Sequence, residues 1–286
     1  MKTIHTLSQE FKKTIFNLGF LTCVLITATL FFTTQLYIET STGKVYSVLE
    51  VIFSLDKTII KSEISFASIN IFQLVINGYF LMFIPIIAAF PFIPNFCSER
   101  NSGLIRYTIG RTGKMRYYIT KFISALLGGG LAVLVGYAVF GIIISIIFPP
   151  LSSYTIPNDL KSYYDVKDTV PIILKSLLGA FLYGAVSAIP AFLMASFVKN
   201  RYIITCVPFM IIYLYNTSLT KISYDAMENS NQGLSNLAYT LRPDTISSLA
   251  YFSDMVRNSL LINLAFVVIC FLVFVLIMNR RWDLGE

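Results

Sequence analysis

The sequence predicts an all-α, polytopic membrane protein whose 286 residues form a single transmembrane domain, 1–286, with six transmembrane helices. Three observations lead to this fold class. Hydrophobic residues make up 56% of the chain and charged residues only 13%, and the mean hydropathy is +0.71. A soluble globular domain has about 25% charged residues. The apolar residues gather in six long runs, and basic residues gather in alternate connections between those runs.

Each apolar run is long enough to cross a bilayer, because a hydrocarbon core about 30 Å thick needs roughly 20 helical residues. The predicted spans are about 15–37, 69–92, 119–148, 171–198, 202–219 and 260–279. The fifth is short and contains Pro208, which tends to kink a helix. Small residues, including Gly129 and Gly184, recur in the third and fourth spans and predict close helix packing there.

Basic residues predict the orientation, since Lys and Arg are enriched in cytoplasmic segments near span ends. With a cytoplasmic N-terminus, thirteen of the 22 basic residues fall in inner segments. We therefore expect both termini to lie in the cytoplasm. We also expect a multi-pass protein of the cell membrane, which would be the plasma membrane of a bacterium. The net charge of +7 reflects this inner-face bias and does not indicate nucleic-acid binding. The first run lacks a small-residue cleavage site, so we expect it to remain a span.

The N-terminal segment has an amphipathic helical pattern. Apolar residues recur at three- and four-residue steps while Lys12 and Lys13 lie off that stripe; the apolar positions are Ile4, Leu7, Phe11, Ile15 and Leu18. This pattern predicts an interfacial helix along the inner membrane surface. A helical extension of the first span is the alternative interpretation.

Catalytic and metal-binding motifs are absent from the sequence. His5 is the only histidine, which excludes an HExxH zinc site and a Ser-His-Asp triad. The four cysteines show no CxxC spacing, and no phosphate-binding GxxxxGK[ST] motif occurs. We therefore expect no enzyme activity, no metal and no cofactor bound by this chain.

Four polar side chains lie inside the apolar runs, namely Gln73, Asn77, Asn216 and Asn263. Hydrogen bonds between helices explain such residues, and contact with a transported substrate is the other interpretation. Lys175 is the only charge inside the spans away from their cytoplasmic ends. Proton- or sodium-coupled transporters normally carry more charges at depth.

The one long polar connection on the inner side covers residues 95–121 and includes CSERNSGLIRYTIGRTGKMRYYITK, residues 97–121. A turn at 101–103 precedes an amphipathic run at 104–109, and a second turn at 110–113 precedes the third span. This order predicts a helix, a turn and a second helix along the inner face.

This stretch resembles the cytoplasmic loop between the second and third spans of ABC type-2 transporter permeases. In that pattern an acidic residue and Arg precede Ser-Gly, and an apolar segment, an Arg, a basic-aromatic pair and a Lys follow. The resemblance implies a coupling helix that docks on a separate ATP-hydrolysing subunit, which binds the ATP and Mg. The residues that it assigns to coupling are Glu99, Arg100, Gly103, Arg106, Arg111, Arg116, Tyr118 and Lys121.

The resemblance further implies an exporter in which this chain forms half of the pathway. A second permease copy or a related permease would supply the other half, and two ATP-binding subunits would supply the energy. A peptide or another amphipathic compound is the expected cargo. Two alternatives stay open: a sensor or assembly factor that docks a cytoplasmic partner through the same basic loop, and a secondary transporter.

Overall fold

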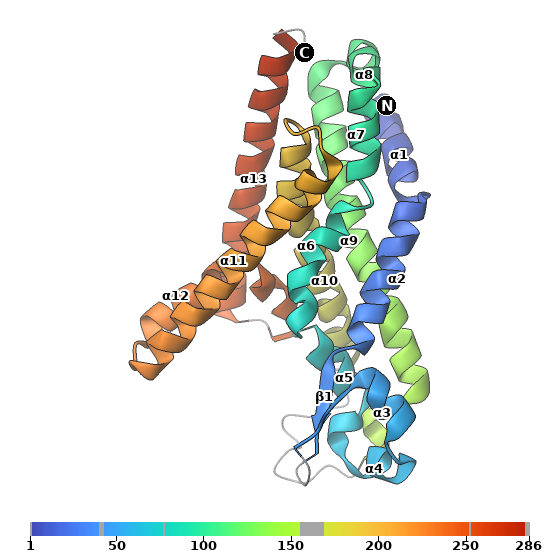
Figure 1. The fold of residues 1–286 in the computed structure, drawn as a ribbon, viewed down its shortest axis with the longest axis vertical. Helices are drawn as coiled ribbons and strands as arrows, with labels where there is room; N and C mark the ends of the chain where they lie inside the picture. The colour runs from blue at the N-terminus through green and yellow to red at the C-terminus, as the bar shows by residue number, and fades with distance from the viewer. Residues whose placement is uncertain (1, 40–42, 77, 155–168, 252, 284–286) are drawn as a thin grey trace.

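The computed structural model describes residues 2–39, 43–76, 78–154, 169–251 and 253–283. Long helices run side by side, and a two-stranded sheet with short helices lies at one end (Figure 1). The α-helices are α1 (Lys2–Ile15), α2 (Leu18–Phe32), α3 (Val48–Ser54), α4 (Lys57–Ser62), α5 (Ser68–Val75), α6 (Ile84–Ala89), α7 (Ile93–Asn101), α8 (Leu104–Thr112), α9 (Lys114–Ile147), α10 (Thr169–Ala195), α11 (Arg201–Glu228), α12 (Gln232–Leu241) and α13 (Asp254–Asp283). The strands are β1 (Gln35–Ile38) and β2 (Val45–Ser47), and the 3-10 helices are η1 (Ile64–Phe66), η2 (Tyr79–Phe83), η3 (Leu151–Ser153) and η6 (Pro243–Tyr251).

Five helical segments of the described chain are long and apolar enough to cross a membrane, and a sixth counts if α1 and α2 are one bent span. They are Leu81–Asn101, Lys114–Ser153, Thr169–Ala195, Arg201–Glu228 and Asp254–Arg280. The structure therefore agrees with the expected helical architecture, in which several helices are able to span a membrane.

The first predicted span, 15–37, is wrong at both ends. α1 and α2 meet at a bend of 54°, and the Asn17 side chain caps α2 by accepting a hydrogen bond from Gly19 N at 3.3 Å. The helix stops at Phe32 because the following residues form β1, which pairs antiparallel with β2. A run of apolar residues does not distinguish a strand from the end of a helix.

The second predicted span, 69–92, is broken rather than continuous. α5 ends at Val75, and the chain passes through η2 and α6 before α7 begins. Pro85 and Pro94 stand at the first turns of α6 and α7, where proline is tolerated because those N–H groups have no helical acceptor. Two buried tyrosines stabilise the broken region. Tyr137 donates to Phe72 O at 2.6 Å and Tyr183 donates to Leu81 O at 3.1 Å.

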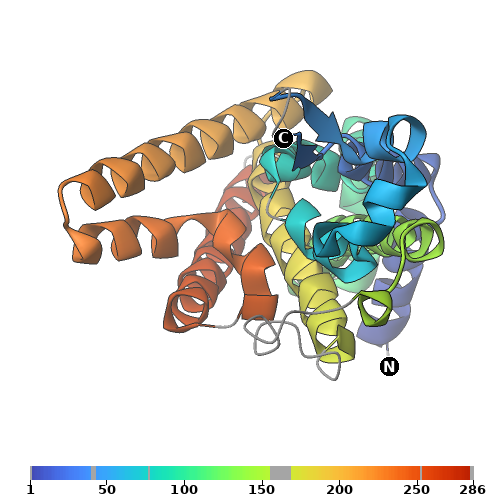
Figure 2. The same cartoon turned by 90° about the horizontal axis from the view of Figure 1, so that it is seen from below.

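The fifth predicted span, 202–219, ends too early, since α11 continues to Glu228. The last turns of α11 contain charged residues and pack against α12, which runs antiparallel to α11. The Ser223 and Ser235 hydroxyls form a hydrogen bond of 2.9 Å between the two helices. The α11–α12 pair projects sideways from the other helices (Figure 2). The predicted span ended just before Lys221, the first charged residue, whereas the contact with α12 stabilises α11 beyond that point.

Glycines bring α9 and α10 together at the centre of the bundle. A Cβ at Gly129 would lie 2.7 Å from Ala188 Cβ, and one at Gly184 would lie 2.8 Å from Val133 Cγ2. Contacts between carbon atoms are optimal near 3.5–4.0 Å. The backbones can approach this closely only because neither residue has a side chain.

Candidate functional site

Both ends of the described chain lie at the same end of the bundle as α8, and the β1–β2 sheet with α3 and α4 lies at the opposite end (Figure 1). The α8 end carries many exposed basic side chains, including Lys12, Arg111, Arg116, Lys199 and Arg201. The described chain offers two candidate functional sites. One is the surface around α8 at this end of the bundle, and the other is a pocket beside α11.

α8 begins and ends at glycines with left-handed backbone angles. Gly103 has φ 71° and Gly113 has φ 90°, values that residues with side chains rarely adopt. α8 buries Ile105 and Ile109 against the bundle. Its other side exposes Arg106, Arg111 and Tyr107, whose exposed fraction is 82%. The helix–turn–helix order predicted for 95–121 is thus found, but the second predicted turn, 110–113, is confined to Gly113 because α8 continues to Thr112. The outer face of α8 is basic and aromatic.

A buried ion cluster lies directly behind α8. Lys121 of α9 is only 2% exposed and pairs with Glu10 of α1 and Glu99 of α7. Lys13 lies 3.5 Å from a carboxylate oxygen of Glu10 and 3.6 Å from one of Glu99. We call Glu10, Lys13, Glu99 and Lys121 the ion cluster. It connects the three helices α1, α7 and α9.

Several residues that the resemblance assigned to docking are internal. The Arg100 guanidinium donates to Ala195 O, the last carbonyl of α10, and to Val198 O in the connection that follows, both at 2.5 Å. Tyr118 is buried and packs edge-to-face on Phe274, with ring centroids 5.8 Å apart. Together with Glu99 and Lys121, these residues hold the bundle together. Gly103 makes the turn, and Arg106, Arg111 and Arg116 are exposed.

Sequence reasoning missed Glu10. Its one signal is that it is the only acidic residue before Glu39 and lies within a basic, amphipathic segment. The pairing of Glu10 with Lys121 could not be predicted, because 111 positions separate the two residues.

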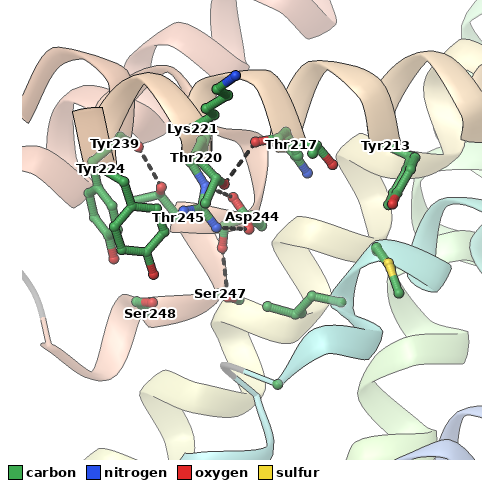
Figure 3. A pocket seen from close by; sticks show the side chains of 15 residues that line it. Tyr213, Thr217, Thr220, Lys221, Tyr224, Tyr239, Asp244, Thr245, Ser247 and Ser248 are labelled. Atoms are coloured by element: carbon green, nitrogen blue, oxygen red, sulfur yellow. Dashed lines mark hydrogen bonds and ion pairs between the residues drawn. The ribbon is translucent and has the colours of Figure 1, made fainter. Parts of the chain in front are cut away.

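The second site is a pocket of about 800 Å³ between α11, α12, η6 and η2 (Figure 3). Its polar wall comprises Asn216, Thr217, Thr220, Lys221, Arg242 and Asp244, and three tyrosines line it as well: Tyr213, Tyr224 and Tyr239. Arg242 Nε and Nη2 donate to the two Asp244 oxygens at 3.0 and 2.5 Å. Burial works against the charged form of Arg242, but these hydrogen bonds and the Asp244 charge outweigh it and raise the Arg242 pKa.

The polar residues predicted along the spans are not brought together. Gln73 accepts a hydrogen bond from the Tyr251 hydroxyl at 2.9 Å, and Asn263 donates to Ser259 O at 2.9 Å within its own helix. Asn77 lies outside the described residues. Of the three described residues of this set, only Asn216 lines the pocket.

Within the described ranges, no group of three or more His, Cys, Asp or Glu residues could hold a metal ion. Comparison of the sequence with models of known protein families and with curated proteins gives no match.

Proposed function

We propose that this chain is the membrane permease subunit of an ATP-driven ABC exporter, inserted through six membrane-spanning segments with both termini in the cytoplasm. The observation that carries this proposal is α8: a short helix between two left-handed glycines that presents Arg106, Tyr107 and Arg111 outward at the basic end of the bundle. Such a face suits a soluble partner with acidic and apolar groups. The partner is an ATP-binding subunit in two copies, which supplies the ATP and Mg.

The ion cluster gives α8 a mechanical role in this proposal. A force applied to α8 passes into α7 and α9, which flank it, and these helices are tied to α1 through Lys121, Glu10 and Glu99. A buried, paired network resists separation of its members. Movement of the ATP-binding subunit would therefore displace helices of the bundle rather than a loose connection.

A second copy of this chain, or a related permease, completes the pathway in this proposal. Many large apolar side chains of α11 and α13 are exposed, among them Leu214, Leu261 and Leu276. Membrane lipid and the second permease would cover these faces. A sensor or assembly factor would use the same α8 surface without transport, and the assays below separate these possibilities.

The proposed orientation predicts a labelling pattern. In a variant with the four native cysteines replaced, Lys57→Cys in α4 should react with a membrane-impermeant thiol reagent in intact cells. Met115→Cys, at the α8 end and 52% exposed, should react only after the membrane is opened. Labelling of Met115→Cys in intact cells, with none of Lys57→Cys, would invert the topology and place α8 outside.

Docking through α8 predicts that Arg111→Glu leaves the protein inserted and folded but separates it from its ATPase. Loss of one partner of an interfacial charge pair costs about 2–5 kcal/mol, or roughly thirty- to several-thousand-fold in affinity. Co-purification of the two subunits and substrate-stimulated ATP hydrolysis measure the effect.

The matched control for Arg111→Glu is Lys61→Glu, an equal charge change on the exposed surface of α4 at the opposite end. Lys61→Glu should retain both signals. Glu99→Lys is not a clean test of docking, because Glu99 belongs to the ion cluster. Wild-type co-purification and hydrolysis in Arg111→Glu would refute the coupling role of α8.

A further inference from the structure

We infer that the pocket beside α11 binds an uncharged, apolar peptide segment, with Asn216 Oδ1 as the acceptor for one of its backbone N–H groups. Naming this peptide as the exported cargo rests on the proposed function, but the binding site itself does not.

Asn216 is the residue that points to a ligand. It is only 9% exposed, and its Oδ1 has no hydrogen-bond partner among the described residues. The Tyr183 hydroxyl donates to Leu81 O at 3.1 Å, so its proton is not available to Asn216 Oδ1. Buried acceptors are nearly always satisfied, so a ligand that brings an N–H into the pocket would be favoured.

The charge of the pocket argues for an uncharged ligand. Arg242 and Asp244 neutralise each other through two hydrogen bonds. Lys221 is the remaining cation of the lining, and its side chain extends along the far side of α11, away from Asp244 and Thr245 (Figure 3). Among the described residues of the lining, a phosphate or carboxylate inside the pocket would find no unpaired cation near Asp244, and burying an uncompensated charge is costly.

The walls of the pocket suit a short extended peptide. Tyr224 and Tyr239 lie together at one end and Tyr213 lies at the other (Figure 3), while Leu81 and Met82 add apolar surface. From Tyr213 to Tyr224, α11 advances about 16 Å at 1.5 Å per residue. An extended peptide covers that length with about five residues. Aromatic rings accept apolar side chains and can also hydrogen-bond through their hydroxyls.

A protection assay tests this inference directly. Thr217 lines the pocket and is exposed, so Thr217→Cys, with the native cysteines replaced, reports occupancy through its rate of reaction with a thiol reagent. The probe is the end-capped peptide N-acetyl-Leu-Ala-Leu-Ala-Leu amide, added to the purified chain. We expect saturable slowing of at least threefold.

The role of Asn216 is tested in the same assay. Asn216→Leu should raise the half-protecting peptide concentration about tenfold, as expected for one lost hydrogen bond. The backbone N-methylated peptide should lose a similar factor on the unsubstituted background. Asn263→Leu, a matched change of another buried asparagine that lies outside the pocket lining, should leave the concentration unchanged.

The inference is overturned if the peptide does not slow the thiol reaction of Thr217→Cys, or if it protects equally well when Asn216→Leu is added. Slowing by dihexanoylphosphatidylcholine in the absence of peptide would also overturn it, because the pocket would then be assigned to lipid. Because this assay contains no ATPase, binding together with failed subunit co-purification would refute the proposed function and keep the site.

Discussion

Lys121→Met is expected to destabilise the folded protein by about 3–5 kcal/mol, the usual cost of removing one partner from a buried ion pair. Lys121 is 2% exposed, and the side chains of its partners Glu10 and Glu99 are only 9% and 19% exposed. Methionine retains most of the packing volume but leaves two carboxylates close together in a poorly solvated place. The loss should be visible as a lower unfolding temperature and a lower yield of monodisperse protein in detergent.

Lys13→Met is the matched control within the ion cluster. Its side chain is 61% exposed, and exposed ion pairs contribute about 0–1 kcal/mol. A triple variant, Glu10→Gln with Glu99→Gln and Lys121→Met, removes every charge that Lys121 contacts and should recover much of the stability. Equal stability of Lys121→Met and Lys13→Met would mean that Lys121 is solvated rather than buried between α1, α7 and α9.

Gly129→Leu is expected to have the second-largest effect on the stability of the folded protein. Its Cβ alone would lie 2.7 Å from Ala188 Cβ, 2.9 Å from Ala88 O and 3.1 Å from Gly184 O. Two of these atoms belong to the backbone and cannot rotate away. Overpacking a close contact costs about 1–3 kcal/mol and occasionally more, so α9 and α10 should separate and the unfolding temperature should fall.

Gly233→Leu in α12 is the matched control for Gly129→Leu. Only Asn231 Oδ1 lies within 4 Å of a Cβ built there, at 3.8 Å. Leucine is a better helix former than glycine by several tenths of a kcal/mol, so this variant should be as stable as the unsubstituted protein or slightly more so. If both variants unfold at the unsubstituted temperature, α9 and α10 do not pack through Gly129.

The sequence predicted those features that depend on neighbouring residues or on composition. Long apolar runs predict membrane-spanning helices, because about 20 apolar residues of helix match the thickness of the hydrocarbon core. Gly103 and Gly113 predicted the turns around α8, because left-handed backbone angles favour glycine locally. Close approach in the third and fourth spans was likewise predicted from the small side chains of Gly129 and Gly184.

The pattern of apolar residues failed where pairing with the next element of the chain decided the outcome. The chain after Phe32 pairs as a strand because β2 is its neighbour, and α11 continues through charged residues because α12 packs on it. Composition could indicate neither.

By itself, then, the sequence predicted a helical architecture with several candidate membrane-spanning helices, and the position of α8. The tertiary structure decided which charges are internal and where a pocket forms. Lys121 and Tyr118 looked like surface residues in a basic segment, yet the packing of α1, α7 and α13 around α9 buries both. Asn216 resembled three other polar residues of the spans, and only the fold of α12 and η6 over α11 placed it in a pocket. The physical reason is the same in each case: burial and ion pairing depend on which helices are neighbours. Contacts between residues far apart in the sequence decide this, such as the pair Glu10 and Lys121, which 111 positions separate.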